Sequence, residues 1–111
     1  MTQTATLTPD VHRFRALARA NQIRIARAEL KRRIAEGEVE AADLILDPPL
    51  AARSWSVGEL LVSQRGWGAT RCRRFLAATH ISERKPVGEL TDRQRRLLAT
   101  QLQAYMSVSR Q

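Results

Sequence analysis

Between Pro9 and Gly37 the chain contains no glycine and no second proline, the two residue types that most readily end a helix. Thr8, Pro9 and Asp10 supply an N-cap, a proline at the first helical position and an acidic residue in the first turn. These signals predict a single helix over most of residues 9–36. In a chain of 111 residues, such a helix leaves room for one compact domain beside it.

The apolar residues of this predicted helix change face halfway along it. One side carries Val11, Phe14, Ala18 and Ile25, and another carries Ile23, Leu30 and Ile34. A helix that packs on one core over its whole length keeps its apolar residues on one side. We therefore expect the second half to pack on the domain and the first half to project as an arm.

Helix signals recur in the rest of the chain. Ser56 and Glu59 form one capping box, and Thr91 and Gln94 form another. Helices are predicted over residues 38–46, 57–64, 69–80 and 91–106, joined by a loop (47–53), a tight turn (65–68) and a connector (81–90). Aromatic residues make up only 5% of the chain, which favours helices over a β-sandwich.

The spacing of apolar residues predicts which faces of these helices are buried. The expected inner residues are Val39, Leu44, Leu46, Ala69, Cys72, Phe75, Leu76, Thr79, Leu97, Leu98, Leu102 and Tyr105. The predicted fold is all-α, with a long basic N-terminal helix in residues 1–37, a compact helical domain in residues 38–106 and a frayed tail in residues 107–111.

Charge points to the class of partner. Nineteen basic residues against eleven acidic ones give a formal charge of +8 and a pI near 11.4. Residues 1–35 hold eight basic and two acidic residues, residues 36–60 hold one and six, and residues 61–111 hold ten and three. A fold that places both basic segments on one side presents a positive surface. A pI above about 9 is typical of a small domain that binds nucleic acid.

The turn Gly66-Trp67-Gly68 between two predicted helices is the strongest candidate for a binding site. Its glycines allow a sharp turn and a close approach to a ligand, and the amides that begin the next helix favour an anion. That helix begins with Ala69, Thr70, Arg71, Arg73 and Arg74. Amides, a hydroxyl and guanidinium groups together predict a phosphate site, with a plain helix–helix turn as the alternative. Trp67 either packs between helices or inserts into a minor groove as an apolar wedge.

The first predicted helix offers a second basic surface. Arg13, Arg24, Arg27 and Lys31 fall within a narrow stripe. This stripe suits a second contact with a duplex. A basic helix is also typical of a membrane surface or of a contact with an acidic protein. Its apolar residues are too few and too divided for strong membrane insertion.

The order and spacing of several motifs resemble the actinobacterial integration host factor family over about residues 24–102. The matching residues are Arg27-Ala28-Glu29-Leu30-Lys31, Val57-Gly58-Glu59-Leu60-Leu61, Gly66-Trp67-Gly68, Ile81-Ser82-Glu83, Leu90 and Arg93-Gln94-Arg95. The resemblance implies a helix-two-turn-helix domain after a long helix. It also implies sequence-tolerant duplex binding, DNA bending and a part in phage integration or chromosome organisation, in which an integrase is a possible partner.

Two positions depart from that family. An aliphatic residue usually stands where this chain has Trp67, and the family's arginine-rich connector is reduced here to Arg84 and Lys85 ahead of Pro86. The chain therefore resembles either a divergent paralogue or a phage-encoded relative. Arg84 and Lys85 remain candidate contacts with DNA.

The expected function is that of a nucleoid-associated protein that binds double-stranded DNA through its phosphates. The alternatives are a module that binds duplex RNA and a protein that binds an acidic protein partner. His12 and His80 are isolated and Cys72 falls on an inner stripe, so we expect no enzymatic activity, cofactor or metal. Residues 1–10 lack the apolar core of a signal peptide, and no apolar run approaches a membrane span, so a cytoplasmic location is expected.

Overall fold

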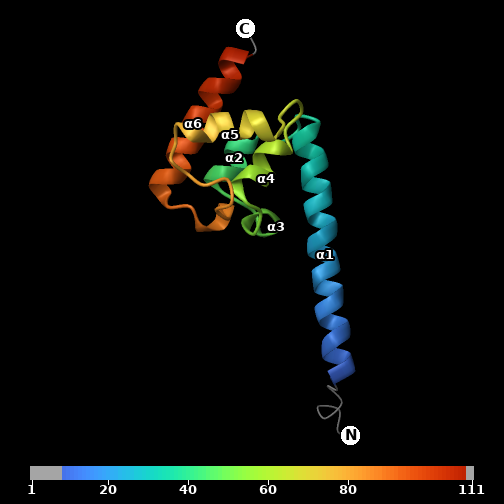
Figure 1. Ribbon diagram of the computed structural model, residues 1–111. Helices are drawn as coiled ribbons and strands as arrows, with labels where there is room; N and C mark the ends of the chain where they lie inside the picture. The colour runs from blue at the N-terminus through green and yellow to red at the C-terminus, as the bar shows by residue number, and fades with distance from the viewer. Residues whose placement is uncertain (1–8, 110–111) are drawn as a thin grey trace, which may run out of the picture.

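The computed structural model describes residues 9–109, and within this range the protein is all-α, as predicted (Figure 1). The helices are α1 (Pro9–Ala35), α2 (Ala41–Leu46), α3 (Leu50–Arg53), α4 (Val57–Val62), α5 (Ala69–Ala77) and α6 (Asp92–Ser109), with a short 3₁₀ helix, η2 (Val87–Glu89), before α6. These residues form no strand, and their one isolated β-bridge joins Ser56 to Pro86. The predicted N-cap Thr8 and the last two residues of the predicted tail lie outside the described range.

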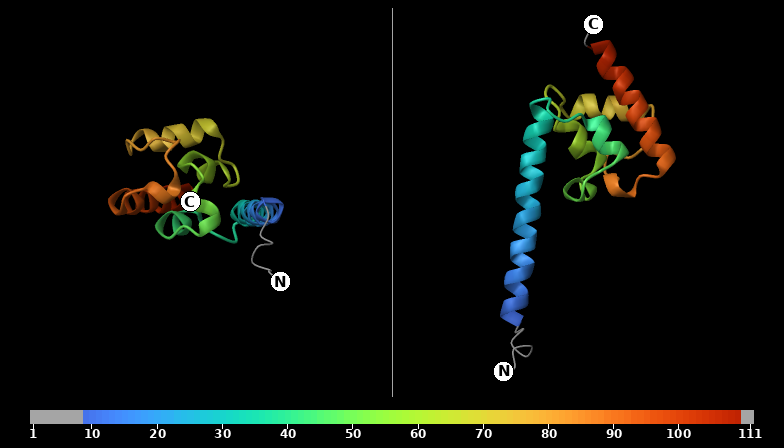
Figure 2. Two further views of the ribbon diagram at one scale, coloured as in Figure 1. Left: turned by 90° about the horizontal axis from the view of Figure 1, so that it is seen from below. Right: turned by 180° about the vertical axis from the view of Figure 1, so that it is seen from behind.

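Helix α1 divides into two halves, as its split apolar faces predict. Ile34 is buried and Leu30 packs against the core, whereas Phe14, Leu17 and Ile25 are 73%, 60% and 62% exposed. Figures 1 and 2 show α1 beside the domain at its C-terminal end and extending well past it at its N-terminal end, which gives a molecule of 67 × 27 × 21 Å. The first half is therefore a projecting arm.

Local signals set the ends of α1 and α6. Gly37 has a φ of +79° and ends α1, because this left-handed conformation suits glycine. At the start of α6, Thr91 and Gln94 exchange two hydrogen bonds, at 3.0 and 3.1 Å, which is the predicted capping box. Helix α6 continues to Ser109, although we predicted fraying from Ser107.

The core of the domain lies where α4 and its preceding turn meet α2 and α6. Its largest fully buried side chains are Trp55, Ile45, Leu60, Leu61, Leu98 and Leu102. α6 packs on α2, and α4 packs on α5. The core thus joins segments from both ends of the domain, and the α4–α5 hairpin packs into it through Leu60, Leu61 and Cys72.

Several predicted inner residues face solvent instead. Leu46, Leu97 and Tyr105 are 46%, 39% and 36% exposed, and Ala69 is exposed. Ile45 and Ala99 are buried in the neighbouring positions. In α6 the buried stripe is centred on Leu98 and Leu102, which turns Leu97 and Tyr105 outward. In α2 the buried face runs through Ala41, Ala42, Leu44 and Ile45, which leaves Leu46 outside it.

Two segments also differ from their predicted secondary structure. The expected loop at 47–53 contains α3, where the amide of Ala52 donates to the carbonyl of Pro49 at 2.9 Å. Helix α5 ends at Ala77, three residues early, and His80 then adopts a φ of +59°. The Thr79 hydroxyl donates to the carbonyl of Leu76 and accepts from the amide of Ile81, which closes the end of the helix.

Candidate nucleic-acid interface

The first turn of α4 is closed to ligands. The Ser56 hydroxyl accepts a hydrogen bond from the amide of Glu59 at 3.0 Å, which is half of the predicted capping box. The amides of Val57 and Gly58 donate at 2.8 Å to the carbonyls of Lys85 and Glu83 in the connector. A side chain at Gly58 would lie 3.1 Å from that Glu83 oxygen, so this glycine permits the close approach of the two segments.

The turn between α4 and α5 needs one of its two glycines for folding. Gly66 has a φ of +82°, in the left-handed region that favours glycine, and the amide of Trp67 donates to the carbonyl of Gln64 at 3.1 Å. Gly68 has a φ of −103°, which any residue adopts, and a Cβ there would meet no atom within 4 Å. The tight turn therefore requires a glycine at position 66, but neither backbone conformation nor space requires one at position 68.

Helix α5, unlike α4, begins with free amides. Gly68 occupies the N-cap position and has no side chain to cap the helix. The first backbone bond of the helix runs from Cys72 to the carbonyl of Gly68 at 3.1 Å. In residues 9–109, no acceptor contacts the amides of Ala69, Thr70 and Arg71, and these three residues are exposed. The positive end of the α5 dipole thus faces solvent, and the absence of a side chain at Gly68 leaves it uncovered.

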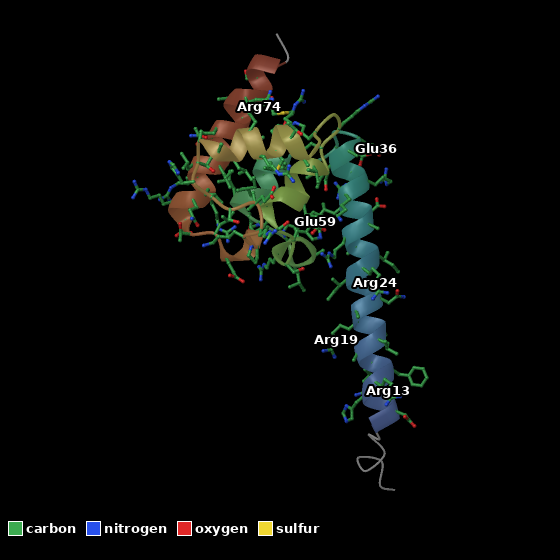
Figure 3. The ribbon with its side chains drawn as sticks, viewed as in Figure 1. Arg13, Arg19, Arg24, Glu36, Glu59 and Arg74 are labelled. Carbon is green, nitrogen blue, oxygen red and sulfur yellow. The ribbon has the colours of Figure 1, made fainter. Side chains whose placement is uncertain are left out.

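The three arginines of α5 have different surroundings. Arg73 lies 3.7 Å from a carboxylate oxygen of Glu83, so its charge is partly balanced. Arg71 and Arg74 form no ion pair within the described part of the chain, and the Arg71 guanidinium lies 5.8 Å from the centre of the Trp67 ring. Thr70, Arg71 and Arg74 border an open groove between α5 and α6 that also contains Phe75 and Tyr105. Figure 3 shows Arg74 on the outer side of α5.

Trp67 is a packing residue rather than a wedge. Its side chain is only 6% exposed, and its ring makes edge contacts with Phe75 and Tyr105 at centroid separations of 5.5 and 5.2 Å. The wedge hypothesis is therefore wrong, because the indole would have to leave this aromatic cluster to reach a groove. Trp67 instead supports the side chain of Arg71.

Two predicted DNA contacts on α1 are bound within the protein. Lys31 and Arg27 lie 2.8 and 3.7 Å from Glu59, and both cations lie over the ring of Trp55. Glu59, labelled in Figure 3, therefore ties α1 to α4. Sequence reasoning assigned Glu59 to a capping box and missed this role, because the two segments are 28 residues apart.

The other candidate cations fall into two places. Arg84 is exposed and Lys85 is half-buried in the connector, which lies beside α5 through the Arg73–Glu83 pair. Arg24 is exposed on the arm, away from the hairpin (Figure 3). The structure thus brings the connector close to the hairpin and places Arg24 on a separate surface.

No group of three or more His, Cys, Asp or Glu side chains in residues 9–109 could hold a metal ion. Cys72 is buried, as expected of a core residue, and its burial and the nearby Glu83 raise the pKa of its thiol while Arg73 opposes the shift. No helix between residues 9 and 109 has the length and apolar character that a membrane crossing requires.

Together the fold and the site define a small all-α protein with a projecting helix and an exposed, basic helix start on a hairpin. No family model matches the sequence, and no curated protein matches it. Among solved structures, the chain is similar to the integration host factor sIHF bound to an 8-bp palindromic DNA, with 26% identity and a TM-score of 0.66. The similarity covers 75% of this chain and 96% of that one, and it supports an integration-host-factor-like fold.

Proposed function

We propose that this protein binds double-stranded DNA as an architectural factor similar to integration host factor. The observation that carries the proposal is the start of α5, where three unsatisfied amides, an uncrowded Gly68 and the unpaired Arg71 and Arg74 share one exposed surface. Amides at a helix N-terminus and guanidinium groups recognise phosphate oxygens. The solved neighbour, sIHF, was bound to a DNA duplex.

The amides and basic side chains at these surfaces also favour sequence-tolerant binding and DNA bending. Amides and arginines directed at phosphates position a protein without reading bases, so binding is sequence-tolerant. Arg84 and Lys85 extend the hairpin surface, and Arg24 with the other arginines of the arm supplies a second contact. Contacts on two separate surfaces favour bending of a duplex between them.

The proposed origin, location and cellular role rest on the resemblance of the sequence motifs to the actinobacterial integration host factor family. We propose a helix-two-turn-helix domain of actinobacterial or phage origin that acts in the bacterial cytoplasm on the nucleoid. Its role is in recombination or chromosome organisation, where an integrase is a candidate partner. Binding and shaping of DNA, rather than catalysis, is the proposed activity, and it requires no cofactor.

Competition and salt dependence test this function. A labelled DNA duplex bound to the protein is challenged with unlabelled duplex DNA, duplex RNA or polyglutamate, and duplex DNA should compete best. The logarithm of affinity should fall linearly with the logarithm of salt concentration, with a slope of about 0.9 for each phosphate neutralised. A nearly flat salt dependence contradicts phosphate recognition, and stronger competition by RNA or polyglutamate identifies another partner.

A further inference from the structure

One exposed side of the arm carries a regular repeat of mostly apolar residues that has no role in the proposed DNA contacts. Residues spaced alternately by three and four follow one side of α1: Val11, Phe14, Ala18, Asn21, Ile25 and Ala28. This is the spacing of the a and d positions of a coiled coil, with Val11, Ala18 and Ile25 at a. The apolar residues Phe14 and Ile25 are 73% and 62% exposed, so no element between residues 9 and 109 covers the stripe at these two positions.

The stripe faces away from the domain. At 100° per residue it is centred about half a turn from the face of Ile23, Leu30 and Ile34. That second face packs on the domain through Ile34 and Leu30. Seen along its axis in Figure 2 (left), α1 has the domain on one side only. A second helix can therefore lie against the stripe without meeting the domain.

The charges beside the stripe fit a second copy of the same helix in the same direction. In a parallel pair, each g residue lies beside the e residue five positions later on the partner helix. Asp10 and Arg24 occupy g positions, and Arg15 and Glu29 occupy the matching e positions. Both combinations, Asp10 with Arg15 and Arg24 with Glu29, pair opposite charges, and two-fold symmetry makes each pair twice. Glu29 then shares its carboxylate between Arg24 of the second copy and Arg32 of its own helix. Asn21, at a d position, would meet its own copy and fix the register.

We propose that α1 is a dimerisation helix that forms a parallel two-stranded coiled coil with a second copy of this chain. The two domains then lie on opposite outer sides of the coil, each held by its own Glu59. Arg24 is then engaged by Glu29 of the second copy, whereas Arg19, at a b position, remains exposed in the dimer and keeps a basic surface on the arm for DNA. The seam is short and contains Asn21 and two alanines, so the dimer is weak and its population depends on protein concentration.

Sedimentation equilibrium without DNA tests the dimer separately from the proposed function. The parent protein should pass from monomer to dimer as its concentration rises through roughly the micromolar to millimolar range. Ile25→Asp should raise the dissociation constant at least tenfold, because it places a charge in the seam. A parent protein that stays monomeric throughout, or a dimer that Ile25→Asp leaves unchanged, overturns the proposal.

A charge reversal with a matched control tests the pairing. Arg24→Glu should raise the dissociation constant by about tenfold, since it sets one glutamate against Glu29 on each side of the dimer. Arg19→Glu makes the same change of charge on the same helix outside the seam and should have little effect. The double variant Arg24→Glu/Glu29→Arg should restore the parent value. Equal effects of the two single variants, or no restoration, overturn the proposed pairing.

Cross-linking tests the direction of the helices and separates a dimer from a lipid contact. In a parallel pair the two copies of Ala28 are neighbours, so Ala28→Cys should form an intermolecular disulfide readily under mild oxidation. In an antiparallel pair these positions lie at opposite ends, and slow cross-linking of the dimer overturns the parallel arrangement. Binding of the monomer to vesicles of phosphatidylcholine and phosphatidylglycerol, with no dimer in solution, assigns the stripe to lipid and overturns the proposal.

Discussion

Gly66 and Gly68 stand one residue apart in the hairpin, and their surroundings give them separate roles. Gly66 adopts the left-handed conformation, with a φ of +82°, that closes the turn. Gly68 has an ordinary φ of −103°, and open space lies where its side chain would be. Folding therefore depends on Gly66, whereas the absence of a side chain at Gly68 leaves the amides of α5 accessible.

Alanine substitutions test this division of roles. Gly66→Ala should lower the free energy of unfolding by about 1–2 kcal/mol, because a side chain disfavours the left-handed region. Gly68→Ala should change it by no more than about 0.5 kcal/mol, because the weaker N-cap is offset by the lower conformational entropy of the unfolded alanine variant. Urea denaturation of both variants measures these values. Equal losses for the two variants would show that Gly68 is also a structural requirement.

At the scale of elements, α1 is held to the domain along only part of its length. The contacts are Leu30 and Ile34 on the core, Arg27 and Lys31 around Glu59, and the packing of α1 on α3. These ionic side chains are 34–42% exposed, so their attraction is screened by water and contributes about 1 kcal/mol at most. The arm before Ile23 has no such contacts to protect its backbone.

Hydrogen exchange tests the attachment of α1. In dilute protein the amides of residues 11–22 should exchange faster than those of α4, because an isolated helix is marginally stable. Glu59→Gln should extend the fast region to Lys31 and leave exchange in α6 unchanged. Asp47→Asn removes one negative charge from the loop before α3 and serves as the control. Exchange at residues 27–31 that is the same in Glu59→Gln and in the parent would mean that the apolar contacts alone hold the helix.

Elements with signals in adjacent residues were predictable, and those fixed by tertiary packing were not. Gly37 and the Thr91–Gln94 capping box fix the ends of α1 and the start of α6 locally, and both were read from sequence. Helix α3 and the buried face of α2 depend on how a short segment fits between other helices, so propensity misplaced them. Contacts between distant segments, such as Lys31 with Glu59, leave no signature in a single sequence.

In the candidate site, too, the local signals could be predicted from the sequence and the tertiary contacts could not. Gly66, Gly68 and the arginines of α5 lie within nine consecutive residues, so sequence alone was enough to select them. The sequence could not distinguish Arg73, which Glu83 partly balances, from Arg71 and Arg74. It also left two readings of Trp67 open, and only packing with Phe75 and Tyr105 decided between them.

Over the whole molecule, ion pairs decide where the positive charge remains available. Near the end of α1, Arg32 pairs with Glu29 and Glu36, and Arg33 pairs with Glu38. The hydrogen bonds with Arg32 also lower the pKa of the Glu29 carboxyl. Charges there largely cancel, whereas the arginines of the arm and Arg71 and Arg74 at the start of α5 form no ion pair among residues 9–109. The arm and the start of α5 are the two surfaces that the proposed function assigns to DNA.

The affinity of Gly68→Glu for a DNA duplex tests the role of the hairpin most directly. Open space at this position and the positive end of the α5 dipole should let the variant fold with near-parent thermal stability. The new carboxylate lies where the phosphate is proposed to bind, so affinity should fall more than tenfold, or by at least about 1.4 kcal/mol. Thr100→Glu adds the same charge at an exposed position of α6, a helix on the opposite side of the domain from α1 in Figures 1 and 2, and should lose much less. Parent-like affinity in folded Gly68→Glu, or equal losses in the two variants, would contradict phosphate binding at this hairpin.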